Sequence, residues 1–158
     1  MGTAIIEQIA QDLVSTLETI TLANDYTFTV PAVTRPRRTG IPYSPAHHEI
    51  IVLAGDRSRE SELDCVGSPP GIAWRQVFSL DLCLRVSEAS TTPIDQLANA
   101  FEVAVVTALM SDRSRGGLAI DTQHARTDYL TADEDYEGCT LLIEVMYRTA
   151  ENDPSTNV

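Results

Sequence analysis

The sequence predicts an α+β fold, in which a mostly antiparallel β-sheet of about five strands carries two α-helices packed on one face. Two segments repeat apolar residues every three or four positions, as amphipathic helices do. Other segments alternate apolar and polar residues, as half-buried strands do. With 158 residues and no linker-like stretch, we expect a single domain over residues 1–150 and a polar C-terminal tail over 151–158.

The first predicted helix covers residues 4–22. Its buried stripe consists of Ile5, Ile6, Ile9, Leu13, Leu17 and Ile20. After a turn at 24–25, the residues "YTFTV" alternate between large apolar side chains and threonine. This alternation predicts a short strand over 26–30, which Pro31 ends.

Two polar stretches interrupt the predicted strands. Residues 34–48 hold three prolines, a glycine and three arginines, and residues 56–71 are mainly polar, so we expect long loops in both places. Loops of this length in a small domain usually carry function.

Residues 47–55 predict a short strand between the two loops. The period of two from Trp74 to Val86 is the clearest strand signal, with one face made by Phe78, Leu80, Leu82, Leu84 and Val86.

The second predicted helix covers residues 93–110, with Thr92 as its N-cap and Pro93 as its first residue. One apolar stripe is formed by Ile94, Leu97, Ala98, Phe101, Ala104, Val105 and Ala108. A second, weaker stripe lies on another side and is formed by Val103, Val106 and Met110. A helix that is apolar on more than one side is covered on more than one side, so its own sheet or a neighbouring subunit is expected to cover this second stripe.

The C-terminal third predicts a turn at 112–117, an extended stretch over 118–130, an acidic loop and a final strand. One face of that strand is formed by Cys139, Leu141, Ile143, Val145 and Tyr147. The other face is formed by Thr140, Leu142, Glu144, Met146 and Arg148.

The formal net charge of −12 disfavours general attraction to nucleic acid or to anionic lipid. We therefore interpret the arginines of "RPRR" and "RSRGG" as partners for acidic groups across a protein contact. The three cysteines have no C-x-x-C spacing and are expected to be reduced structural thiols. No apolar run approaches the roughly 20 residues that span a bilayer, so we expect no membrane partner.

The sequence carries no recognisable catalytic motif, so we expect no enzymatic activity, no cofactor and no metal. His47 and His48 are adjacent, so in a strand they point to opposite faces and cannot easily share a ligand. The nucleophile-elbow, phosphate-loop and dinucleotide-loop patterns are absent. The acidic run over 133–137 lacks the calcium-loop spacing; a solvated loop is the favoured interpretation, and a weak cation site is the alternative.

Three stretches in order carry a resemblance to a known family: "WRQVFSLDLCLRV", "TTPIDQLANAFEVAVVTAL" and "EGCTLLIEVMYRTAENDP". In this order of elements, and most specifically in the last strand, the chain resembles the tail-terminator (tail-completion) proteins of long-tailed bacteriophages. The last strand of that family commonly reads Glu-Val-x-Tyr-Arg-Thr followed by Asp-Pro, as residues 144–149 and 153–154 do here.

The resemblance implies a small subunit that forms a hexameric ring at the head-proximal end of the tail tube, stops tube growth and offers a surface to the head. Its implied partners are copies of itself, the tail tube protein and a neck or head-completion protein. DNA would pass through the channel without specific binding. The implied location is the tail of the virion, after assembly in the host cytoplasm.

We predict that subunit or partner contacts involve Arg35, Arg37, Arg38, Val103, Val106, Met110, Tyr147 and Arg148. A neck or head-completion connector subunit is an alternative within the same structural class. A small cytosolic enzyme or ligand-binding domain is the alternative of a different class.

Overall fold

The computed structural model describes residues 2–27, 29–35, 49–84, 92–130 and 137–158. These residues build a five-stranded sheet with strand order β1-β2-β3-β5-β4 and two α-helices, which confirms the predicted α+β class. Strands β1 and β2 pair in parallel, and the other three pairs are antiparallel. The elements are α1 (Ile5–Glu18), η1 (Leu22–Asn24), β1 (Ala32–Thr34), β2 (Glu49–Arg59), η2 (Ser61–Leu63), β3 (Gly71–Leu84), α2 (Ile94–Met110), β4 (Asp121–Leu130) and β5 (Glu137–Ala150).

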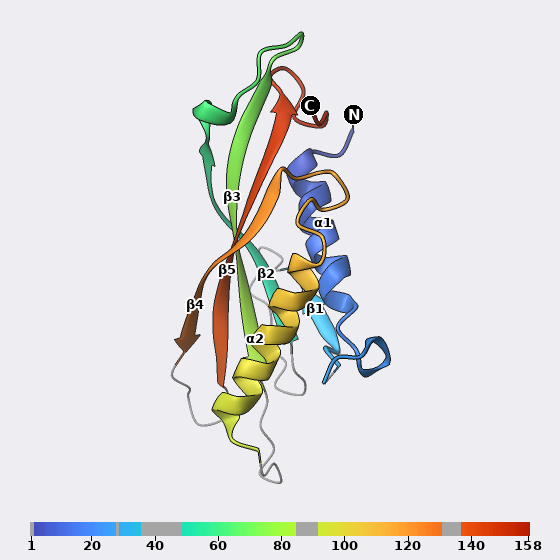
Figure 1. Ribbon diagram of the computed structural model, residues 1–158, viewed down its shortest axis with the longest axis vertical. Coiled ribbons are helices and arrows are strands. Elements are labelled where there is room, and N and C mark those ends of the chain that lie inside the picture. The colour runs from blue at the N-terminus through green and yellow to red at the C-terminus, as the bar shows by residue number, and fades with distance from the viewer. Residues whose placement is uncertain (1, 28, 36–48, 85–91, 131–136) are drawn as a thin grey trace.

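Both α-helices lie along one side of the twisted sheet (Figure 1). The alternation in β3 and β5 directs every second side chain toward them, and this face forms the core. The predicted inward residues of β5, from Cys139 to Tyr147, are each at most 1 % exposed. The outward residues of the same strand are half-buried, and neither of the two α-helices covers that far face of the sheet.

The predicted strand over 26–30 is wrong, because the first strand is Ala32–Thr34 and begins after Pro31. Asp25 adopts a left-handed conformation with φ of 64°, which turns the chain back on the end of α1. The Tyr26 and Val30 amides then donate to the Thr21 and Ile20 carbonyls at 3.3 and 2.9 Å. Their hydrogen bonds are therefore local, and this stretch does not join the sheet.

Strand β2 extends beyond the predicted 47–55 and takes up the first part of the predicted 56–71 loop. The pairing with β3 continues to Arg59 opposite Trp74 after a register shift between Ala54 and Arg57. Gln76 Nε2 donates to the Gly55 and Asp56 carbonyls at 2.8 and 3.2 Å and so satisfies the backbone at this irregularity. Polar residues are tolerated here because this part of the hairpin is exposed.

Helix α2 begins at Ile94, and Pro93 is its N-cap. The prediction of Thr92 as the N-cap and Pro93 as the first helical residue is therefore wrong by one residue. No side-chain cap hydrogen bond forms at this end. Most of the predicted 34–48 loop and of the predicted acidic loop over 131–138 lies outside the described residues.

The polar C-terminal segment 151–158 folds back over the start of α1. The Ile5 amide donates to the Pro154 carbonyl at 3.0 Å, and the Ala150 amide donates to the Thr156 carbonyl at 3.0 Å. Asp153 holds this turn, since its carboxylate accepts from the Ser155 amide and from the hydroxyls of Ser155 and Thr156. The segment therefore closes the helix N-terminus, whose first amides have no partner within the helix.

Replacing Asp153 with asparagine is expected to remove a pH-dependent part of the stability. The hydrogen bonds from Ser155 and Thr156 lower the pKa of Asp153 to about 2, below its ordinary value of 3.8. Stabilisation by this group is thus present above pH 3.8 and is lost as the pH falls toward 2. The midpoint difference between wild type and D153N in urea, followed by fluorescence of the single Trp74, should shrink over this range.

The control for this comparison is D56N, since Asp56 is exposed and its carboxylate has no hydrogen bond among the described residues. A midpoint difference for D153N that stays constant from pH 5 to about pH 2 would contradict the assigned role of the carboxylate.

Candidate subunit interface

The predicted second stripe of α2 differs along its length in exposure. Val103 is 64 % exposed, whereas Val106 and Met110 are half-buried and pack against the core. The side chain with surface to offer a partner is therefore Val103, and the other two are largely covered by the chain itself.

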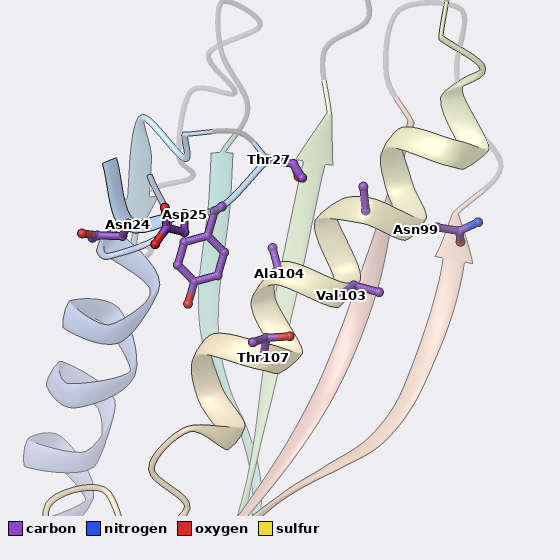
Figure 2. A pocket seen from close by; sticks show the side chains of 9 residues that line it. Asn24, Asp25, Thr27, Asn99, Val103, Ala104 and Thr107 are labelled. Atoms are coloured by element: carbon purple, nitrogen blue, oxygen red, sulfur yellow. The ribbon is translucent and has the colours of Figure 1, made fainter. Parts of the chain in front are cut away.

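Val103 lies on a groove between α2 and the turn that follows α1 (Figure 2). The groove has a volume of 540 Å³. One wall is formed by Asn24, Asp25, Tyr26 and Thr27, and the other by Asn99, Ala100, Val103, Ala104 and Thr107. The helical wall follows from spacing, since residues 99, 103 and 107 recur every four positions and so share one side of α2.

The other flank of α2 is closed against β4 by polar contacts. Tyr129 Oη and Thr127 Oγ1 donate to the Glu102 carboxylate at 2.6 and 2.5 Å. The hydrogen bond to Glu102 raises the pKa of Tyr129 to about 12. For Glu102 itself, burial acts to raise the pKa, but the two hydrogen bonds outweigh it and the pKa is lowered. The helix is thus tied to the sheet on one side and open on the groove side.

The structure places the predicted pair at the end of β5 on opposite faces of the sheet. Tyr147 is 1 % exposed and belongs to the core, where burial raises the pKa of its hydroxyl. Tyr147 was predicted to take part in subunit contacts, but in the folded chain it has almost no surface to offer a partner. Arg148 lies on the far face, where its Nε donates to the Leu63 carbonyl at 3.0 Å.

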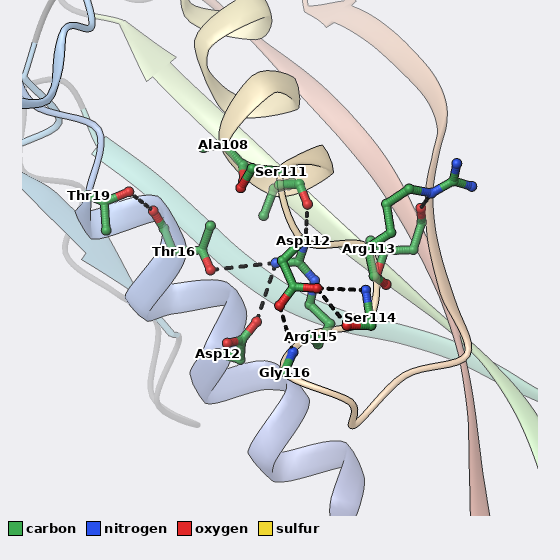
Figure 3. Close-up of polar contacts among 12 residues, drawn as sticks. Asp12, Thr16, Thr19, Ala108, Ser111, Asp112, Arg113, Ser114, Arg115 and Gly116 are labelled. Atoms are coloured by element: carbon green, nitrogen blue, oxygen red, sulfur yellow. Dashed lines mark hydrogen bonds and ion pairs between the residues drawn. The ribbon is translucent and has the colours of Figure 1, made fainter.

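The "RSRGG" arginines bind acidic groups of their own chain, contrary to the predicted contact between chains. Arg113 pairs with Asp121 at 2.8 Å. Arg115 is 1 % exposed; it pairs with Asp12 on α1 at 3.3 Å and donates to the Leu109 carbonyl at the end of α2 (Figure 3). These two arginines hold the turn between α2 and β4 in place.

Arg35 is likewise paired within the chain, through two hydrogen bonds to Glu7 at 2.6 and 3.0 Å. The predicted partners Arg37 and Arg38 lie outside the described residues. The sequence contains no lysine, and its eleven basic residues are arginines. The described ones all have partners in the chain: Arg35, Arg59, Arg75, Arg113, Arg115 and Arg126 bind carboxylates, Arg57 lies over the Trp74 ring, and Arg148 binds Leu63.

Sequence reasoning missed the wall formed by residues 24–27, because it assigned 26–30 to a strand. The Asn24-Asp25 pair signalled a turn, and the spacing of Asn99, Val103 and Thr107 signalled a shared helix side, but nothing local indicates that these two features meet. Among the described residues no cluster of three or more His, Cys, Asp or Glu could hold a metal. No helix there is long and apolar enough to cross a membrane.

The chain is similar in structure to solved proteins, although its sequence matches no known family. No family model matches the chain, and no curated protein matches it. A solved structure described as the virion of a native gene transfer agent particle is similar, with a TM-score of 0.44 and 15 % identity over 92 % of each chain.

Proposed function

We propose that this chain is a structural subunit of a bacteriophage-type virion, a tail terminator that caps the tail tube as a ring. In this role it stops polymerisation of the tube and presents a docking surface to the neck or head-completion protein. It acts by shape and association and catalyses no reaction. The residues that resemble the tail-terminator family, 144–149 and 153–154, support this proposal.

The observation that carries the proposal is the open apolar side of α2. The groove beside it is lined largely by apolar atoms of Tyr26, Ala100, Val103 and Ala104, and Val103 is 64 % exposed. An apolar recess with an exposed valine and a polar rim offers surface that another protein can cover. A ring requires that each copy offer such a surface to the next.

The distribution of charge also fits a ring around DNA. Six of the eight described arginines pair with carboxylates of the chain, so they add little free positive charge to a protein whose net charge is −12. A channel of like charge does not hold the phosphate backbone as it passes.

Deleting the gene from a phage that encodes it tests the proposal. Loss of the terminator should give overlong tails that fail to join heads, and electron microscopy of wild-type particles should place the chain as one ring at the head-proximal end of the tail. Tailless heads beside free tails of normal length would instead indicate a neck connector. Particles of normal form would reject a structural role.

Complementation sharpens this test. V103D should reproduce the deletion phenotype, because it places a charge on the open apolar surface. S15D is the matched control, since Ser15 is exposed on α1 and the substitution adds the same charge outside the groove.

A further inference from the structure

A second cavity lies where the start of α1 and the C-terminal segment meet the sheet. It has a volume of 360 Å³, and its apolar wall is formed by Ile6, Ile72, Ala150 and Pro154. None of the residues that line it also lines the groove beside α2, so the two hollows are separate sites. The half-buried side chains of Ile6 and Ile72 leave apolar surface that a ligand can cover.

Arg57 also lines this cavity, and its positive charge is not paired with a carboxylate among the described residues. It lies over the Trp74 ring, with 4.8 Å between the guanidinium carbon and the ring centroid. Burial raises the pKa of the Tyr147 hydroxyl, and a hydrogen bond with Arg57 acts against that rise. The guanidinium is therefore held by an aromatic ring and a neutral hydroxyl, in contrast to the six described arginines that bind carboxylates.

An arginine held in this way is prepared to bind an anion. The guanidinium presents its N–H donors in a planar fork that matches the two oxygens of a carboxylate. Because stacking on Trp74 orders the side chain in advance, less conformational entropy is lost when a ligand binds. Thr149, which also lines the cavity, accepts from Trp74 Nε1 at 3.2 Å, and its own hydroxyl hydrogen has no acceptor among the described residues. Arg57 and Thr149 thus both have donors to offer a carboxylate.

The arrangement of charges favours an anion over a cation. A cation that approached the Trp74 ring would meet the positive charge of Arg57, which already lies over that ring. Glu151 also lines the cavity, but it is exposed and forms no ion pair with Arg57. Water therefore screens part of the repulsion between Glu151 and a bound anion.

The exposure of Arg57 indicates how the anion reaches it. Sites for small molecules enclose roughly 70–90 % of the ligand surface. The Arg57 side chain is exposed, so a carboxylate can pair with it while the chain that carries the carboxylate stays outside the cavity. This geometry suits a side chain that projects from another protein.

We propose that the cavity binds the carboxylate of an acidic side chain on a segment of a partner protein, in which apolar residues flank the acidic one. Arg57 pairs with the carboxylate, Thr149 donates a hydrogen bond to it, and an apolar neighbour packs on Ile6 and Ile72. This inference goes beyond the proposed function and does not depend on it, because it concerns a surface other than the open side of α2.

A capped tripeptide tests the contact. Acetyl-Leu-Glu-Leu-amide carries a single charge, and its titration into the full-length protein should change the fluorescence of Trp74, the only tryptophan, in a saturable way. Acetyl-Leu-Gln-Leu-amide, with a neutral amide in place of the carboxylate, should bind about tenfold more weakly. The R57Q variant should lose about the same factor for the acidic peptide and should no longer distinguish the two peptides.

Two further variants separate this contact from general attraction. R126Q changes the net charge as R57Q does, but Arg126 is exposed on β4 outside the cavity, so its affinity should stay within about twofold of wild type. E151Q should bind the acidic peptide at least as tightly as wild type, because it removes a negative charge that lines the cavity. Circular dichroism checks that each variant is folded, since R57Q itself changes the surroundings of Trp74.

The inference is overturned by a titration without saturation, by equal affinities for the acidic and the neutral peptide, or by R57Q binding as wild type does. The free carboxylate 4-methylpentanoate is a second probe. If it binds while the acidic peptide does not, the ligand is a small molecule and the assignment to a protein segment is rejected. The gene deletion tests the proposed function separately, so either proposal can fail while the other stands.

Discussion

Replacing Arg115 with alanine is expected to lower the free energy of unfolding by about 2–4 kcal/mol. Arg115 is 1 % exposed and is the link between α1 and the turn after α2, through Asp12 and the Leu109 carbonyl. The substitution leaves that carbonyl without this donor and removes a buried side chain. Urea denaturation followed by Trp74 fluorescence measures the loss.

The neighbouring R113A variant is the control for Arg115. In the wild type the Arg113 guanidinium also pairs with a carboxylate, that of Asp121 at 2.8 Å, but the Arg113 side chain is 56 % exposed. Exposed pairs contribute little, so R113A should cost less than about 1 kcal/mol. Equal losses for R113A and R115A would show that burial of Arg115 does not set its contribution.

Replacing Gly138 with alanine is expected to destabilise the chain by about 1–3 kcal/mol. Gly138 pairs with Cys83 where β5 enters the sheet, and an added Cβ would collide with the Leu82 carbonyl oxygen. That oxygen belongs to the backbone of β3, at the residue that pairs with Cys139, so it cannot swing away as a flexible side chain can. Relief of the collision requires the two central strands to separate locally.

The control for this change is G55A, which also places a methyl group on a strand glycine. The nearest atom to a Cβ at Gly55 is the Val77 carbonyl oxygen at 3.4 Å, and the residue is exposed. We expect G55A to stay within about 1 kcal/mol of wild type. A G138A protein as stable as G55A in the same denaturation experiment would contradict the close approach of β3 and β5.

The strength of the sequence patterns explains which elements could be predicted. Among the described residues, the inward faces of β3 up to Leu84 and of β5, and the apolar stripes of both helices, pack in or against the core as expected. The reason is that periods of two and 3.6 follow directly from backbone geometry. The same alternation groups Tyr147 with Cys139, Leu141, Ile143 and Val145, which the structure buries together. Assigning Tyr147 to an interface departed from that pattern.

The errors have a common origin in contacts between distant residues. The extension of β2 to Arg59 depends on pairing with β3, since the polar residues 56–59 carry no strand signal of their own. The segment 26–30 has a strand pattern, yet the amides of Tyr26 and Val30 donate to the Thr21 and Ile20 carbonyls, which follow α1. Local preference in both places is outweighed by the partner that the fold supplies.

The sequence by itself determined the α+β class, the faces of the main helices and strands, and an acidic chain without a recognisable catalytic motif. The tertiary structure alone decided the partners of the described arginines, the open groove beside α2 and the docking of residues 151–158 on α1. The physical reason is that periodicity is a local property of the backbone. An ion pair such as Asp12 with Arg115 forms between residues far apart in the sequence, so it appears once the chain has packed.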